Sequence, residues 1–149
     1  MLVGLDPLLG PELLMFLRGM GHGDEIAIVD ANFPALSHAR RLLRLDGSDA
    51  SRALAAVLSV LPLDSFVDTP ASGMQVVGKP DEVPPAIADF QEIVDRLAGF
   101  PVRIARIERH GFYDRAKACF ALVVTSDRRF YANIILTKGV IGADGKVVA

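Results

Sequence analysis

A histidine and an aspartate eight residues apart are the side chains best suited to proton chemistry in this sequence. His22 stands between Gly21 and Gly23, just after an expected helix, and Asp30 closes the short apolar run Ile26 to Val29. That run indicates a buried strand, and in open α/β sheets ligands bind outside the carboxyl ends of the strands. An imidazole titrates near neutral pH, so it can donate and recover a proton there. The alternatives are a solvated histidine at a helix end and an aspartate that only closes an Asx-turn.

Two later segments carry polar groups that could complete a pocket. Arg109 and Tyr113 fall in one strand-to-helix segment, while Tyr131 and Asn133 enter the last expected strand two residues apart, so their side chains share one face. Arginine holds hydroxyl groups without losing its charge, and asparagine donates and accepts hydrogen bonds at once. Convergence of these groups with the histidine and the acid would make a polar pocket. A solvated charged face and simple edge packing are the alternatives.

Other common site motifs do not occur. The glycine-rich segment Gly19 to Asp24 follows an expected helix instead of a strand, and the third glycine position of the dinucleotide fingerprint holds Asp24. There is no phosphate loop, nucleophile elbow or H-E-x-x-H motif, and no Cys/His spacing suits a zinc site. Cys119 lies in an apolar run, so we expect an inert thiol in the core. The sequence therefore predicts no metal site.

Composition limits the partners of the chain. The chain has 149 residues, of which 16 are basic and 18 are acidic, so its net charge is -2. Hydrophobic residues make up 51% of the sequence. Nucleic acid is unsuitable as a partner because phosphate binding needs a concentrated basic face. Every apolar stretch is shorter than the ~18 to 20 residues of a membrane helix, and no basic signal region is found, so we expect a cytoplasmic protein. A mean hydropathy of +0.35 predicts apolar surface buried between subunits.

The hydrophobic periodicity predicts one α/β domain over residues 1-142, with a C-terminal tail at 143-149. Its sheet is expected to be mixed, mostly parallel and covered by helices, because a short turn at Ser126 to Arg129 joins the last two strands. Helices are expected at Pro11 to about Met20, Ser51 to Leu61, Pro85 to Leu97 and Gly111 to Ala118. Strands are expected at Ile26 to Val29, Leu42 to Leu45, Met74 to Val77, Val102 to Ile107, Phe120 to Thr125 and Asn133 to Thr137.

Five short motifs, in their order along the chain, resemble one known family. They are Gly21-His22-Gly23-Asp24-Glu25-Ile26, Asp30-Ala31-Asn32-Phe33-Pro34-Ala35, Leu63-Asp64-Ser65-Phe66, Phe112-Tyr113-Asp114-Arg115-Ala116 and Tyr131-Ala132-Asn133-Ile134-Ile135-Leu136, the last followed by Lys138-Gly139-Val140. From Leu9 to Val140 the chain resembles the fucose mutarotase and ribose pyranase family. The first and fourth motifs resemble the L-fucose branch more than the ribose branch. Fucose members carry histidines at the positions of Asn32 and Leu36.

The resemblance implies a three-layer α/β fold, with residues 1-142 as a fucose mutarotase-like domain. It further implies a ring-shaped decamer of stacked pentamers, with active sites near subunit contacts and no cofactor. The implied activity is the interconversion of the α and β anomers of L-fucose or a related aldose. The resemblance makes His22 the proton donor and Asp30, Arg109, Tyr131, Ala132 and Asn133 the substrate-binding residues, with Tyr113 as a further candidate. The alternatives are a ribose-type pyranase and a non-catalytic sugar-binding or transport-accessory protein.

Overall fold

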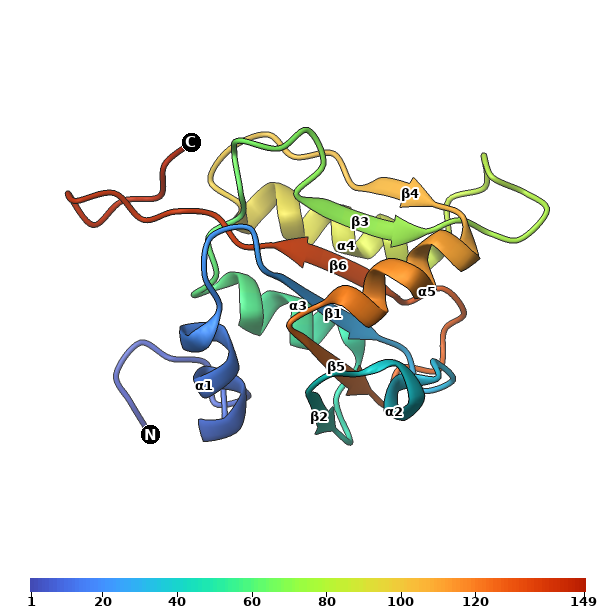
Figure 1. Ribbon diagram of the computed structural model, residues 1–149, viewed down its shortest axis with the longest axis horizontal. Helices are drawn as coiled ribbons and strands as arrows, with labels where there is room; N and C mark the ends of the chain where they lie inside the picture. Colours follow the sequence, from blue (N-terminus) through green and yellow to red (C-terminus); the bar gives the residue numbers. More distant parts are fainter.

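Six strands form one sheet in the computed structural model, which describes all 149 residues (Figure 1). The strands are β1 (Glu25–Val29), β2 (Leu42–Leu45), β3 (Ala71–Met74), β4 (Ala105–Ile107), β5 (Ala121–Thr125) and β6 (Ile134–Thr137). The helices are α1 (Pro11–Gly19), α2 (Ala35–His38), α3 (Ala50–Leu58), α4 (Pro85–Leu97) and α5 (Arg109–Ala118). All the expected helices and strands occur, α2 being the one helix that the periodicity does not predict.

The sheet is mixed and mostly parallel, as expected, in the order β2-β5-β1-β6-β3-β4. β6 runs antiparallel to both of its neighbours, β1 and β3, while the other neighbouring pairs are parallel. The last two strands are not neighbours, however, because β1 lies between them. The segment that joins them, residues 126–133, is therefore a crossing over the carboxyl end of β1 and not a hairpin turn.

Helices cover both faces of the sheet, which gives three layers (Figure 1). Alternate residues of β1 point to opposite faces, as the pleat of a strand requires. Ile26 and Ile28 pack in the larger core, to which α1, α3 and α4 contribute their buried side chains. Ala27 and Val29 pack in a smaller core with α2 and α5. β1 is thus buried on both faces, which explains why its sequence is continuously apolar.

Two expected strands differ from the observed ones, and α4 packs against both segments. The strand expected at Met74 to Val77 lies instead at 71–74, where a Cβ on Gly73 would come within 2.5 Å of Cδ1 of Ile87. The small residues of β3 make room for that helix. The strand expected at Val102 to Ile107 pairs only from Ala105, because the Gln91 side chain takes the backbone carbonyl of Val102 and the amide of Ile104.

Hydrogen bonds that the sequence does not predict fix the start of α5 and the C-terminal segment. α5 begins at Arg109, two residues earlier than expected, because the Glu108 carboxylate accepts the free amides of His110 and Gly111. The domain boundary at residue 142 stays a prediction. Residues 143–149 fold back on the chain, with the Val148 amide donating to Val140 and the Val148 carbonyl accepting from Ser65.

Cys119 is fully buried, as expected for a core thiol. Burial raises its pKa to about 12, so the thiolate is scarcely populated at neutral pH. No helix has the length and apolar character needed to cross a membrane.

Two glycines give opposite predictions for stability. A Cβ on Gly139 would lie 2.3 Å from the Leu63 carbonyl oxygen, whereas one on Gly111, inside α5, would meet nothing within 4 Å. We expect Gly139→Ala to lower the free energy of unfolding by about 1–3 kcal/mol, because backbone must move. Gly111→Ala should raise it by roughly 0.5–1 kcal/mol. Denaturant unfolding at one protein concentration measures both changes, and a shift of the same sign in the two variants would contradict the prediction.

Candidate active site

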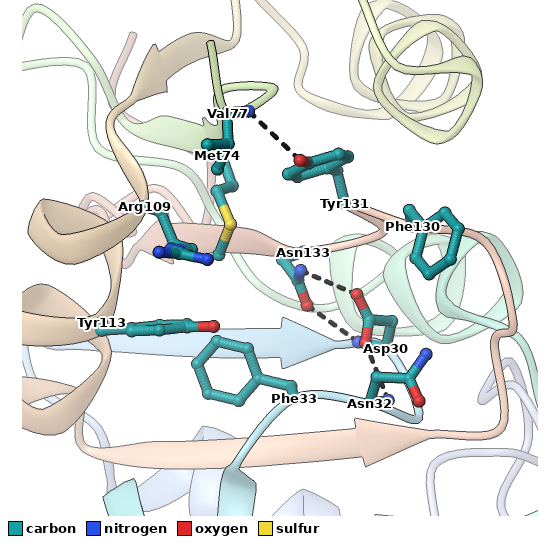
Figure 2. A pocket seen from close by; sticks show the side chains of 10 residues that line it. All are labelled: Asp30, Asn32, Phe33, Met74, Val77, Arg109, Tyr113, Phe130, Tyr131 and Asn133. Carbon is teal, nitrogen blue, oxygen red and sulfur yellow. Dashed lines mark hydrogen bonds between the residues drawn. The ribbon is translucent and has the colours of Figure 1, made fainter.

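A cavity of about 350 Å³ lies at the carboxyl ends of β1 and β3 (Figure 2). Four segments line it: the loop after β1, the end of β3 with the following loop, the first turns of α5, and the crossing before β6. The lining residues are Asp30, Asn32, Phe33, Met74, Val77, Arg109, Tyr113, Phe130, Tyr131 and Asn133. This volume is at the small end of the roughly 300–1,000 Å³ range of ligand pockets. The site therefore suits a small polar molecule.

The antiparallel pairing of β1 with β6 creates the polar centre of the cavity. Its register places Ile28 opposite Ile134, which brings Asn133 beside the end of β1. The Asp30 amide donates to Oδ1 of Asn133 over 2.9 Å, and Nδ2 of Asn133 donates to Oδ2 of Asp30 over 2.8 Å. Both residues are buried, so a pair joined by two hydrogen bonds lies where β1 ends and β6 begins.

The surroundings of Asp30 raise its pKa above the ordinary value for an aspartate. Burial is the largest cause, and the negative charge of Asp127 acts in the same direction. Hydrogen bonds from the Asn32 amide, the Asn133 side chain and the Phe33 amide oppose the shift without cancelling it. A carboxyl group with a raised pKa exchanges protons closer to neutral pH, which suits a general acid or base.

Arg109, the first residue of α5, presents its guanidinium group to the same cavity (Figure 2). Its Nε atom is buried and has no hydrogen-bond partner. A buried donor without a partner costs free energy. The other nitrogens of the guanidinium group are donors that can bind the oxygen atoms of a small ligand.

Tyr131 has a strained backbone at the edge of the cavity. Its φ of 62° lies in the left-handed region, the only such value among the non-glycine residues. Its phenol oxygen accepts the amide hydrogen of Val77 over 3.1 Å, which ties the crossing before β6 to the loop after β3. Non-glycine residues adopt this conformation at a cost, and such strain clusters at functional sites. Ala132, expected to bind substrate, does not line the cavity, because its side chain is fully buried in the larger core.

An aromatic group closes the side of the cavity near α5. The Tyr113 ring meets Phe33 edge-to-face at 5.3 Å between ring centroids, and His38 of α2 lies 5.4 Å from the same ring. Sequence reasoning missed Phe33, Met74, Val77 and Phe130, which line the cavity as apolar residues without a chemical signature. No group of three or more His, Cys, Asp or Glu side chains is arranged to hold a metal ion.

His22 lies away from this cavity, before the amino end of β1, whereas Asp30 follows its carboxyl end. The five residues of β1 alone separate the two by about 16 Å at 3.2–3.4 Å per residue. His22 contacts Asp64 instead, with 3.1 Å between Nε2 and Oδ2, and its ring meets Phe66 edge-to-face. The imidazole is half exposed and the carboxylate is buried. Asp64 received no role from the sequence, although it follows an apolar run much as Asp30 does.

The fold and the cavity define an α/β protein with a small polar site at the carboxyl ends of its strands. The model of the RbsD / FucU transport protein family matches residues 3–141, and the chain belongs to that family. It is 44% identical to the fucose mutarotase of Homo sapiens over 94% of each chain. The fucose mutarotase of Streptococcus pneumoniae, solved in complex with L-fucose, is 38% identical, has a TM-score of 0.88, and covers 95% of this chain and 100% of its own.

A more distant relative shares the fold. RbsD of Bacillus subtilis, solved in complex with D-ribose, is 19% identical and has a TM-score of 0.72 over 90% of this chain and 95% of its own. That identity supports a common fold only.

The Asp30–Asn133 pair predicts a shift in an acid–base equilibrium. Asn133→Ala removes a donor to the Asp30 carboxylate, so the pKa of Asp30 should rise further above its ordinary value. Loss of the two hydrogen bonds should also cost about 1–3 kcal/mol of unfolding free energy. Asn32→Ala is the matched control, because Asn32 reaches Asp30 through its backbone amide alone. Carbon-detected NMR titration of the carboxyl group measures the pKa, and equal values in all three proteins would contradict this account.

Proposed function

We propose that this protein is a monosaccharide mutarotase that interconverts the α and β anomers of L-fucose or a closely related aldose. The observation that carries the proposal is the convergence of the Asp30 carboxyl group, the Asn133 amide and the Arg109 guanidinium group at one small cavity. The similarity to fucose mutarotases over nearly the whole chain indicates that the substrate is L-fucose or a related sugar. The proposal makes the protein an isomerase.

The reaction needs two proton transfers and no change of oxidation state. A proton leaves the anomeric hydroxyl while another reaches the ring oxygen, so that the ring opens. The carbonyl group then rotates, and closure on its other face gives the second anomer. Asp30 would accept a hydrogen bond or a proton from a sugar hydroxyl, and Arg109 would hold the hydroxyl oxygens. Tyr131 would offer its ring face to the C–H side of the sugar, while Ala132 could contribute only main-chain atoms.

The proton donor expected at His22 must then come from a neighbouring copy of the chain. Apolar side chains are exposed near both halves of the site: Phe66 and Val67 near the His22–Asp64 pair, and Phe130 and Val77 at the cavity. Their burial against each other would favour an interface that carries His22 to the cavity of the next subunit. Asp64 would orient the imidazole. This composite site is the form that we propose for the decamer, and the cytoplasmic location stays a prediction.

A non-catalytic sugar-binding protein is the second candidate, because the cavity of one chain holds no histidine. A ribose-type pyranase is the third, and the replacement of the fucose-branch histidines by Asn32 and Leu36 is the observation that favours it. Saturation-difference NMR of anomer exchange separates the three. We expect the protein to accelerate L-fucose exchange more than D-ribose exchange. Sugar binding without acceleration would establish the second candidate, and faster ribose exchange the third.

The role of His22 predicts a loss of rate with little loss of binding. His22→Ala should slow anomer exchange by about 10² to 10⁴, the usual contribution of a positioned acid or base, while changing sugar affinity far less. His110 is the control, since it is exposed and does not line the cavity, and His110→Ala should stay within about twofold of the wild type. Exchange NMR beside calorimetry measures both quantities. An undiminished rate in His22→Ala would transfer the proton-donor role to another residue.

The composite site predicts that two variants, each impaired in a different half of the site, complement each other. His22→Ala chains keep an intact cavity, and Asn133→Ala chains keep an intact His22–Asp64 pair. Random mixing in one oligomer should restore about a quarter of the sites, because each site needs one cavity and one neighbour of the right type. Light scattering should show a mass near 160 kDa, that of a decamer of 16.0-kDa chains. No recovery in mixed oligomers would place the whole site within one subunit.

A further inference from the structure

The crossing between β5 and β6 is held in place by two charged residues that do not touch the cavity. This segment, residues 126–133, supplies three of the ten cavity residues: Phe130, Tyr131 and Asn133. Asp127 and Arg129 lie at its start, on the side toward α3 and α4. Their hydrogen bonds join this segment to the loop after β1, to α3 and to α4.

Asp127 joins three segments although it is buried. Its backbone carbonyl accepts the amide of Ala31, the residue after Asp30, over 2.9 Å. Its Oδ2 accepts the amide of Ala50, which is the first residue of α3, over 3.0 Å. Its own amide donates to Oγ1 of Thr125, which in turn donates to the Val29 carbonyl. One side chain and its backbone thus connect the ends of β1 and β5 to the start of α3.

Arg129 completes the cluster from the other side. Its guanidinium group donates to both oxygens of Asp127, to Oγ of Ser51 over 2.9 Å and to the carboxylate of Asp89 in α4. Burial acts to raise the pKa of Asp127, but the hydrogen bonds from Arg129 and Ala50 outweigh it, and that pKa lies below its usual range. Both charges are therefore present at neutral pH, and the pair is permanent.

We infer that the Asp127–Arg129 pair is a positioning element of the sugar site, which fixes the left-handed Tyr131 and the Asp30–Asn133 pair in their binding geometry. The inference rests on the proposed function for the identity of the ligand. A half-buried ion pair is often replaceable by apolar residues at little cost in stability, so stability alone does not account for it. The geometry does account for it, because Asp127 holds the amide of Ala31, the residue after Asp30, and Arg129 lies two residues before Tyr131 on the crossing.

The adjacent arginines provide a matched pair of variants. Arg128 is exposed and makes no side-chain hydrogen bond, whereas Arg129 makes the contacts described above. Arg129→Gln should raise KM for L-fucose on the order of tenfold, because the groups that the crossing positions bind the sugar. Its kcat should change less than about threefold, because the substitution leaves both the His22 proton donor and the Asp30 carboxyl group in the protein. Arg128→Gln should leave both values unchanged.

Hydrogen exchange supplies a readout that does not depend on activity. In Arg129→Gln the Ala31 amide should lose protection while the amides of Ile28 and Val123, in the middle of β1 and β5, keep theirs. An equal loss of protection in those strands, or KM and kcat both within twofold of the wild type, would overturn the inference. Equal effects of Arg128→Gln and Arg129→Gln would overturn it as well.

A milder variant and a binding measurement cover two further cases, an Arg129→Gln variant that does not fold and a wild-type protein that binds sugar without catalysis. Should Arg129→Gln fail to fold, Asp89→Ala removes only the contact to α4, and a smaller increase in KM with unchanged kcat is expected. A wild-type protein that binds L-fucose without accelerating its exchange would refute the proposed function alone. In that case a weaker calorimetric affinity in Arg129→Gln, with the local loss of protection at Ala31, would still support positioning, and an unchanged affinity would refute it.

Discussion

The structure depends on one requirement: the carboxylate that ends β1 is buried and must be given hydrogen-bond donors. An unpaired carboxylate in this environment would be far more costly than an unpaired neutral group. Asn133 meets the requirement because β6 runs antiparallel to β1 and begins where β1 ends. The crossing over β1, the left-handed backbone of Tyr131 and the antiparallel direction of β6 together place that amide beside Asp30. The cavity is the space that these segments leave above the pair.

Much of the fold was predictable because each element carries its own local signal. The apolar run of β1 and the spacing of Ile87, Phe90 and Val94 in α4 specify a buried strand and an amphipathic helix without reference to the rest of the chain. The sequence failed where a distant side chain decides the outcome. The Gln91 side chain donates to the Val102 carbonyl and accepts from the Ile104 amide. Ile87 packs so closely on Gly73 of β3 that a larger residue there would meet its side chain. Neither contact has a local sequence signature.

The residues of the candidate site likewise fall into a predictable group and an unpredictable one. Asp30 and Asn133 were predictable as strand-end polar residues, and the structure brings them together with Arg109, Tyr113 and Tyr131. The cavity's apolar residues were not predictable, since Met74 or Phe130 looks in sequence like any core or surface hydrophobe. His22 stands out in the sequence as a residue able to do chemistry, but the strand predicted at Ile26 to Val29 already lies between it and Asp30 and keeps the two side chains apart. Spacing along a strand sets distance, and here it sets the residues apart.

That separation constrains how the proposed chemistry can work. β1 is the strand between β5 and β6, hydrogen-bonded on both edges and covered on both faces, so no local movement can bring its two ends together. A chain that used His22 and Asp30 on one sugar molecule must therefore combine them from two copies. In such an assembly the geometry of the site depends on the stability of the sheet. β1 is a rigid strand that carries the proton donor of one site at its start and the acid of the next site at its end. Mutations that loosen β1 would then affect two active sites at once, one at each end.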